Sequence, residues 1–443
     1  MTFAELSVAL QQGGVVGAGG AGFPSYAKLN EKADTIILNC AECEPLLKLH
    51  RQVLEQNAKE ILDTLDLIAK ILGVKQVIIG VKEAYHGAVS ACEALLPFYN
   101  NMSIALLPEI YPAGDEIVLI YEATGRVVAP GALPISQGIG VFNVETMLNA
   151  WYAIQGKPVT HKYVTICGEV SNPVTVLAPI GCTVKDLLPL AGQITCADPA
   201  YVMGGLMMGA LGSPSTVITK TSNAVIVLPS DHPVVSQKQR KTSVDLHRAM
   251  AACCHCNYCT DLCPRHLLGH PIDPAAFMRV ASHMKADVVK PYVDSYFCCG
   301  CGLCEMYACG QSLSPRALLT ATKNGLRAGG VMPPKDVKPA SVPKNRDYRR
   351  VPVARLTARL GVTKYDLPAP ITEDEVAVKK VSIPLSQHIG VPATPIVKVG
   401  DTVEIGQPIA TAAEGKLSVA IHASVNGKVT AVTEKCVTVS TRK

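Results

Sequence analysis

The chain has 17 cysteines, and they concentrate between residues 253 and 309. Two runs in this segment share one pattern, three cysteines two residues apart and a fourth further on. A loop of that spacing wraps three irons of a [4Fe–4S] cluster, and its fourth thiolate reaches toward a second cluster. We therefore expect two clusters that carry electrons. The runs are Cys253, Cys256, Cys259 and Cys263, followed by Pro264, and Cys298, Cys301, Cys304 and Cys309, followed by Gly310.

The fourth cysteine of each run is expected to cross to the cluster of the other run. Cys309 would then join Cys253, Cys256 and Cys259, and Cys263 would join Cys298, Cys301 and Cys304. The second run has one extra residue before its last cysteine and no proline after it, so Cys309 fits the pattern less closely. Two zinc sites are the alternative, because C-x2-C pairs also bind zinc. Triplets with a distal fourth cysteine favour iron and sulfur, with Cys254 and Cys299 as bystanders.

A second group of residues could bind an anionic, planar cofactor. Gly17, Gly19, Gly20 and Gly22, in GAGGAGFP, let the backbone approach a phosphate or a flat ring with its amides free. This loop precedes the first expected strand, so it is not the dinucleotide-binding fingerprint, and alone it could be a packed turn. Three further motifs follow it: NCAECEP at 39–45, YPAGDE at 111–116 and FNVET at 142–146.

These motifs need a scaffold that brings them together, and the apolar pattern of residues 1–157 predicts one. Helix-period spacing alternates with short apolar runs bounded by turn residues. Strands that alternate with helices imply a mostly parallel sheet covered by helices. We expect strands at 35–40, 76–81 and 103–107 and helices at 3–12, 46–72 and 84–96.

The rest of the chain changes character several times. Short β runs around one helix predict a small α+β module, and the cysteine runs lie on helix-and-loop sequence. The C-terminal part alternates Val and Ile with polar residues between glycine turns, which is typical of a compact β unit. The expected units after residues 1–157 are a β module at 158–238, a cluster-binding domain at 239–326, a Pro/Lys-rich linker at 327–379 and a β domain at 380–443.

Composition excludes several classes of protein. At 443 residues the chain is too long for one core, and 48% hydrophobic residues with 17% charged suit a globular protein. No apolar run reaches the roughly 18 residues of a membrane span. The net charge of +5, one Trp and six Phe, with no basic stripe among aromatics, do not indicate nucleic-acid binding. The N-terminus has no basic patch before an apolar segment, so we expect no secretory signal and a cytoplasmic location.

Together, the four motifs and the cysteine runs resemble the flavin- and NADH-binding subunit of respiratory complex I and the C subunit of the Rnf complex. In module order the chain is most similar to the cobalamin reductases of propanediol-utilising bacterial microcompartments. The resemblance covers nearly the whole chain. It implies a multidomain α/β protein with a Rossmann-like FMN-binding domain, a β-grasp (SLBB-like) module, a double [4Fe–4S] ferredoxin-like helical domain and a C-terminal barrel-sandwich hybrid (biotinyl/lipoyl-like) β domain.

The resemblance also implies a non-covalent FMN on the glycine loop and NADH beside it. Asp115 and Phe142 depart from the complex I pattern, which has Glu and Asn there, so their contacts are open. Without the resemblance, Glu42 and Glu44 would be read as capping or surface residues. No residue is assigned as catalytic. The implied cofactor-binding residues are Gly17, Gly19, Gly20, Gly22, Phe23, Lys28, Asn39, Glu42, Glu44, Gly114, Asn143 and Thr146, with Lys28 near the phosphate and Phe23 and Glu44 near NADH.

The implied activity is an NADH-dependent reductase in which FMN and two clusters pass electrons to cobalamin, taking cobalt from Co(III) to Co(II) and Co(I). The implied partners are an adenosyltransferase and microcompartment shell proteins, inside a microcompartment. The alternatives are an Rnf-like electron-transfer subunit serving ferredoxin or a membrane partner, and a structural zinc protein. Lys416 is not expected to be modified, and the helix at 3–12 is expected to pack on its own domain rather than dock a shell.

Overall fold

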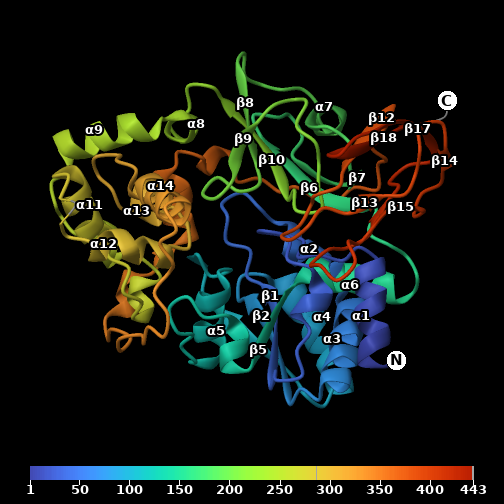
Figure 1. Ribbon diagram of the computed structural model, residues 1–443, viewed down its shortest axis with the longest axis horizontal. Helices are drawn as coiled ribbons and strands as arrows, with labels where there is room; N and C mark the ends of the chain where they lie inside the picture. Colours follow the sequence, from blue (N-terminus) through green and yellow to red (C-terminus); the bar gives the residue numbers. More distant parts are fainter. Residues whose placement is uncertain (286, 442–443) are drawn as a thin grey trace.

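The computed structural model describes residues 1–285 and 287–441. Its long axis separates two ends (Figure 1). The helices of residues 242–328 gather at one end, and the strands of residues 380–441 lie at the other. Between the two ends lie an α/β domain and a second, mixed sheet. Among the described helices, none combines the length and apolarity that crossing a membrane requires.

The α/β domain is built on four parallel strands in the order β3-β2-β1-β5. Both faces of the sheet are covered, as parallel sheets require. Ile36 and Leu38 of β1 face α1, α2, α3, α4 and α6, whereas Ile37 faces α5. The elements are α1 Phe3–Gln12, β1 Thr35–Cys40, α2 Leu49–Gln56, α3 Ala58–Leu72, β2 Gln76–Lys82, α4 His86–Leu95, β3 Met102–Leu107, β4 Ile110–Tyr111, α5 Glu116–Thr124, β5 Ile139–Asn143 and α6 Val144–Ile154.

The predicted strands and the first helix of this domain are confirmed, but the predicted helix at 46–72 is wrong in one respect. It is divided into α2 and α3 at Asn57, whose backbone is not helical (φ −129°, ψ 32°). Both the backbone amide and the side-chain Nδ2 of Asn57 donate to the carbonyl of Val53, at 3.0 Å each, so Asn57 caps the end of α2. Apolar spacing continues across this break, which is why the sequence pattern did not reveal it. In α1, Leu6 and Leu10 are fully buried in the domain, as expected for a helix that packs on its own sheet.

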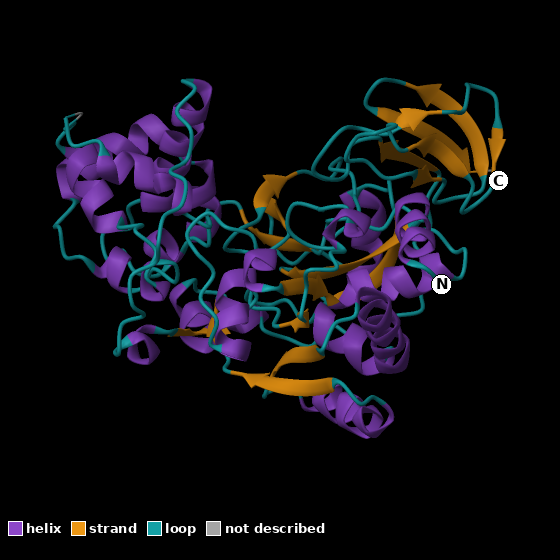
Figure 2. Ribbon diagram, turned by 60° about the horizontal axis from the view of Figure 1, so that its bottom comes forward, coloured by secondary structure: helices purple, strands orange, loops and turns teal. Residues whose placement is uncertain are grey.

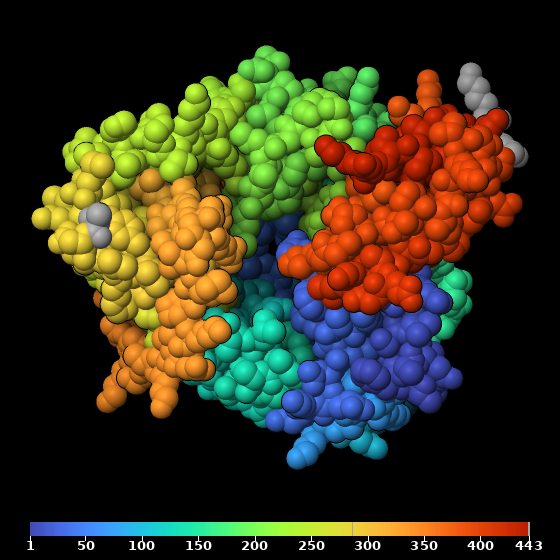
Figure 3. Space-filling model, in the orientation of Figure 1, coloured from blue at the N-terminus to red at the C-terminus, as the bar shows by residue number. Residues whose placement is uncertain are grey.

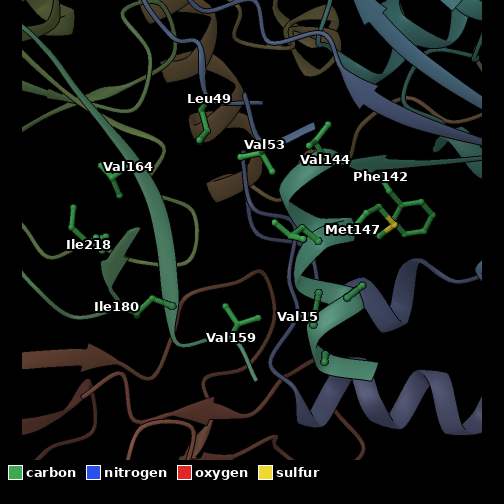
Figure 4. Packing of buried hydrophobic residues seen from close by; sticks show 14 of the residues in the cluster. Val15, Leu49, Val53, Phe142, Val144, Met147, Val159, Val164, Ile180 and Ile218 are labelled. Atoms are coloured by element: carbon green, nitrogen blue, oxygen red, sulfur yellow. The ribbon is translucent and has the colours of Figure 1, made fainter. Parts of the chain in front are cut away.

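The second sheet has the strand order β7-β6-β10-β8-β9 and is mixed, with β6 and β10 parallel. Its core is continuous with that of the α/β domain. Figure 4 shows Val144 and Met147 of α6 on one side of this shared core and Val164 of β6, with Ile180 and Ile218, on the other. Its elements are β6 His161–Gly168, β7 Val174–Pro179, α7 Val184–Leu187, β8 Pro199–Met203, β9 Ala210–Gly212, β10 Ala224–Pro229 and α8 Pro233–Gln239.

The cysteine-bearing domain is helical and has a small core of its own, centred on Phe277, Met278 and Leu319. Short helices there begin directly after or between cysteines. The elements are α9 Thr242–Ala252, α10 Tyr258–Asp261, α11 Pro274–Ser282, α12 Lys290–Val293, α13 Leu303–Met306 and α14 Pro315–Ala328.

The segment 327–379 differs from the predicted linker, because its second half is folded against the α/β domain. Strand β11 (Val351–Pro352) pairs with β4, and helix α15 (Val353–Arg359) follows it. Arg346 forms an ion pair with Glu122 at 2.6 Å and lies over the ring of Tyr121. These long-range partners order a segment whose own sequence carries little apolar periodicity.

The C-terminal residues form a small β domain of two sheets, ordered β12-β18-β17-β14 and β13-β15-β16 (Figure 2). It shares a buried core with the α/β domain and the mixed sheet. Its strands are β12 Lys380–Pro384, β13 Thr394–Pro395, β14 Thr402–Val403, β15 Pro408–Thr411, β16 Ile421–His422, β17 Gly427–Val432 and β18 Cys436–Thr441.

Candidate functional site

Two asparagines mark the carboxyl edge of the parallel sheet, where ligands of such sheets bind. Asn39 of β1 and Asn143 of β5 are partners in the ladder. The Asn39 amide nitrogen donates to the carbonyl of Gly114 at 2.9 Å, and its oxygen accepts the amide of Ala41. Asn143 caps α6 by accepting the amides of Glu145 and Thr146. The structure thus brings three of the predicted motifs to one edge.

The glycine loop lies against the same edge. Val16 and Pro24 pair across its base, and the Gly17 amide donates to the Phe23 carbonyl. The Ala18 amide donates to Thr146 Oγ1 at 2.9 Å, which ties the loop to the start of α6. Within the described residues, the amides of Gly19, Gly20 and Ala21 donate no hydrogen bond. The loop therefore offers a row of free donors of the kind that binds phosphate.

Lys28 and Phe23 flank this loop. The Lys28 ammonium lies 2.5 Å from the carboxylate of Glu116 and 5.9 Å from the ring centre of Phe142. Phe142 is buried, and its ring lies beneath the ammonium group of Lys28 as part of the packed interior. Phe23 is 38% exposed at the end of the loop, which leaves its ring open to an incoming planar ligand.

Glu42 carries a buried oxygen that accepts no hydrogen bond in the described part of the chain, although the ring nitrogen Nδ1 of His50 lies 3.8 Å from it. Its Oε2 accepts the amide of His50 at 3.1 Å, but Oε1 has no hydrogen bond. The backbone of Glu42 is held in place by Tyr85, whose hydroxyl donates to the Glu42 main-chain carbonyl at 2.8 Å. An unsatisfied buried acceptor costs about 1–3 kcal/mol, so this atom fits a ligand N–H group. The carboxylate therefore suits a bound flavin.

Glu44 is used differently. Its two carboxylate oxygens accept the amides of Met207 and Met208, at 2.8 and 2.9 Å, in the turn between β8 and β9. Desolvation raises its pKa, while the two amides act against this rise. Glu44 thus joins the α/β domain to the mixed sheet, and the capping role considered for it is the one that the structure shows. Its contact with NADH stays a prediction.

Asp115 links the flavin-side motifs to the cysteine domain. It caps α5 by accepting the amides of Ile117 and Val118, and its other oxygen receives Arg265 at 2.7 Å. Arg265 also lies beside the thiol of Cys299. A cavity of about 330 Å³ opens here, lined by Glu116, Leu133, Arg265, Phe297 and Cys298 among others. It spans the distance from the Lys28–Glu116 pair to the second cysteine run.

The thiols of the first cysteine set lie near one another, and their crossed assignment to one cluster stays a prediction. Burial first, and then the neighbouring thiols of Cys256, Cys309 and Cys253, raise the pKa of Cys259 to about 12. Cys309 therefore lies with the first run although it belongs to the second. The amide of Leu313 donates to its sulfur at 3.4 Å.

The thiols of the second set lie near Cys263, and their assignment to one cluster also stays a prediction. Burial raises the pKa of Cys304, and Glu305 and then the nearby thiols of Cys298 and Cys263 act in the same direction. Cys301 lies near Cys263 and Cys304 as well. In the part of the chain that the structure describes, no three His, Cys, Asp or Glu side chains close around a single metal ion. The thiols form two open groups, and their soft donors suit iron–sulfur clusters.

Sequence reasoning missed two residues at these sites. Arg265 follows the Cys263–Pro264 pair directly, so its position beside a cluster run was a usable signal. Asn223, just before strand β10, carried no such signal in the sequence, because the glycine loop that it faces is distant along the chain. Its amide nitrogen would lie 3.2 Å from a Cβ on Gly19, and its buried Oδ1 has no partner among the described residues. The face of the molecule drawn in Figure 3 has a hollow at its centre, and N-terminal residues lie at the floor of this hollow.

Four families of domains match the chain in the predicted order. They are the Nuo51 FMN-binding domain at residues 10–151, the SLBB domain at 163–210, the 4Fe-4S dicluster domain at 252–314 and the RnfC barrel sandwich hybrid domain at 367–442. The predicted multidomain architecture is therefore confirmed.

Two curated relatives match over almost the full length. Cobalamin reductase PduS of Salmonella typhimurium is 39% identical over 437 residues, which are 98% of this chain and 96% of the relative. Cobalamin reductase PduS of Citrobacter freundii is 38% identical over 433 residues, 96% of this chain and 94% of the relative.

Two solved structures of an NAD+-reducing [NiFe]-hydrogenase show a weaker likeness. The H2-reduced form has a TM-score of 0.48 at 19% identity, covering 74% of this chain and 63% of that one. The air-oxidised form has a TM-score of 0.47 at 20% identity, covering 82% and 67%. At these scores the likeness carries no argument about this chain.

Proposed function

The chain belongs to the cobalamin reductase PduS family, and on that premise we propose that it oxidises NADH and delivers single electrons to cobalamin. NADH gives up two electrons as a hydride and leaves as NAD+. Two one-electron reductions of the corrin cobalt, Co(III) to Co(II) or Co(II) to Co(I), balance each hydride. FMN, when bound, converts the hydride into single electrons, and two [4Fe–4S] clusters conduct them.

One observation carries the proposal: the YPAGDE motif and the second cysteine run line the same cavity. The Lys28–Glu116 pair stands at one side of it, and Arg265 and Cys298 stand at the other. A carrier of electrons needs its donor and acceptor sites close together, and the shared cavity of Glu116, Arg265 and Cys298 supports such an arrangement.

For FMN, the residues of the sheet edge fit the group. Gly17, Gly19, Gly20 and Gly22 would let the backbone approach the cofactor, and the amides of residues 19–21 and Lys28 would bind its phosphate. Glu42 Oε1 is a buried acceptor without a hydrogen bond, which a flavin N–H would satisfy. Asn39, Gly114, Asn143 and Thr146 would hold the ring system from the strand ends.

Phe23 is exposed enough for its ring to contact a bound NADH. Its ring can pack on the nicotinamide side and hold it against the flavin. Glu44 would reach NADH only by giving up its bonds to Met207 and Met208, so we assign it a positioning role at the module junction.

For the clusters, the crossed sets supply four thiolates each. Cys253, Cys256, Cys259 and Cys309 would bind one, and Cys263, Cys298, Cys301 and Cys304 the other. Ligand thiols must be deprotonated, so cluster assembly would release protons from the buried cysteines with raised pKa values.

The setting follows from the family. We propose that the protein works in the cytoplasm inside a bacterial microcompartment for propanediol use, with an adenosyltransferase that traps Co(I) and shell proteins around it. Trapping would favour the second reduction, which is difficult for NADH.

An Rnf-like relay to ferredoxin or a membrane partner is the second candidate, favoured by the match of residues 367–442 to the RnfC barrel. The experiment is anaerobic holoprotein with NADH and either hydroxocobalamin or ferredoxin, followed by absorbance. Reduction of the corrin supports the proposal. Reduction of ferredoxin with no reduction of the corrin would favour the relay.

A further inference from the structure

The two cysteine sets differ in their exposure to solvent. Cys301 and Cys304 are 9% and 8% exposed, inside the junction between the domains. In the other set Cys256 is exposed, and so is Cys254 next to it. Large apolar side chains near Cys256 are also exposed to solvent: Met250 is 47% exposed and Tyr258 is 49% exposed. One set is therefore interior and the other lies at the surface.

The interior set is bonded to the cofactor-binding motifs. Tyr111, in YPAGDE, donates its hydroxyl to the carbonyl of Cys301 at 2.6 Å. Asp115 of the same motif holds Arg265, which lies beside Cys299. The cavity lined by Glu116 ends at Cys298.

A third connection runs through the mixed sheet. Glu44 accepts the amide of Met207, and Arg316 donates to the carbonyl of Met207. Arg316 is also ion-paired with Glu305, the residue after Cys304. The interior set is thus fixed to the flavin-side residues from three directions.

The surface set is connected differently. Within the described residues, no hydrogen bond joins Cys253, Cys256 or Cys259 to the α/β domain. It does neighbour the interior set, because helix α10, which carries Cys259, packs against helix α13, which carries Cys304. An electron could pass from one set to the other without leaving the domain.

We propose that Cys263, Cys298, Cys301 and Cys304 form the entry centre, which receives electrons from the flavin side, and that Cys253, Cys256, Cys259 and Cys309 form the exit centre. This order rests on the proposed function. Each hydride from NADH would supply two electrons and release one proton to solvent, and the electrons would pass singly through the entry centre and then the exit centre. A corrin cobalt ion at the surface takes one electron at a time and falls by one oxidation state.

The first test needs no variant. Anaerobic holoprotein is exposed to a water-soluble iron chelator, freed thiols are trapped with iodoacetamide, and the labelled cysteines are mapped by mass spectrometry. We expect Cys253, Cys256, Cys259 and Cys309 to be labelled first, with Cys254 as the exposed reference thiol. Earlier or simultaneous labelling of the interior set would overturn the order.

The second test compares Cys256→Ala with Cys301→Ala, after iron and acid-labile sulfide have been counted. In Cys256→Ala, the remaining cluster should still become reduced once NADH bleaches the flavin, as seen by EPR. In Cys301→Ala, the flavin should bleach while the remaining cluster stays oxidised. The opposite pattern, or reduction of the remaining cluster in both variants, contradicts the proposal.

These readouts separate the order from the function. Neither cysteine labelling nor EPR of the clusters uses cobalamin. If the wild-type protein failed to reduce hydroxocobalamin, the proposed function would be wrong, but the order of the entry and exit centres could still be measured. Should a variant lose both clusters, the labelling of the wild-type holoprotein decides.

Discussion

The polar residues at the sheet edge are largely bonded to backbone groups, whereas in the described part of the helical domain few hydrogen bonds to the cysteine thiols are found. Asn39, Asn143 and Glu44 each make hydrogen bonds to backbone groups. Among the cysteines, Cys298 and Cys309 accept only weak bonds from amides at 3.4 Å. The α/β domain also shares an extensive core with its neighbours, whereas the helical domain has a small core of its own.

This difference suggests two ways of holding a cofactor. The flavin side is arranged before the flavin binds, because its own hydrogen bonds set the geometry. The cluster side has only a small core of its own, so we expect the order of its loops to depend on the clusters. The predictions below test that contrast, beginning with the largest effect.

Replacing one ligand of the surface set should damage only the cluster side. We expect Cys259→Ala to lose one cluster and to abolish reduction of the acceptor, while NADH still bleaches the flavin. Iron content, flavin absorbance and limited proteolysis measure these effects, with cleavage confined to residues 242–328. Cys254→Ala, which removes the neighbouring exposed thiol, is the matched control. Loss of flavin reduction in Cys259→Ala would contradict the view that the flavin site works independently of the cluster-binding domain.

Lys220 tests how tightly the flavin side is assembled. Its buried ammonium donates to the carbonyls of Gly14 and Ala420, and burial lowers its pKa to about 7. Between pH 7 and the unfolded value near 10.5, the unfolded chain carries a proton that the folded chain lacks, so stability rises with pH.

We expect a slope of up to about 1.4 kcal/mol per pH unit from this residue. Urea unfolding at several pH values measures it, and Lys220→Met should remove it. Lys59→Met, which removes an exposed amine paired with Asp63, should keep the slope. The same slope in Lys220→Met would show that the burial of this amine does not matter.

Asn223 tests whether the mixed sheet completes the cofactor site. If its amide joins the free amides of the glycine loop at the flavin phosphate, Asn223→Ala should weaken FMN binding about tenfold, the equivalent of one hydrogen bond to a charged group. Riboflavin, which lacks the phosphate, is the control ligand, and its affinity should not change. Fluorescence titration of the apo-flavoprotein compares the two. An equal loss for both ligands would indicate general damage to the loop.

Glu44 gives the smallest expected effect. A glutamine keeps one acceptor for the amides of Met207 and Met208 and places a donor against the other. We expect Glu44→Gln to lower stability by about 1 kcal/mol and to leave the KM for NADH unchanged. Thermal unfolding and steady-state kinetics report the two quantities. A raised KM with unchanged stability would return Glu44 to the NADH site.

Local features were predictable because their signals are local. The helix at Phe3–Gln12 and the strand at Thr35–Cys40 were predicted at their observed bounds, since apolar spacing and turn residues lie within the segments themselves. The division of α2 from α3 was not, because the break at Asn57 leaves the apolar spacing intact. The folded half of 327–379 was missed because its partners, such as Glu122, lie far away along the chain.

The sequence alone determined the kinds of chemistry: thiol runs spaced for iron–sulfur clusters, and a glycine loop whose backbone can approach an anion. Both follow from side-chain type and short spacing, which any fold would preserve. The tertiary structure decided which cysteine set is buried against the flavin-side residues, which partner occupies Glu44 and that Asn223 faces the loop. Those outcomes depend on the packing of elements remote in sequence, where burial and hydrogen bonding are settled only when the domains meet.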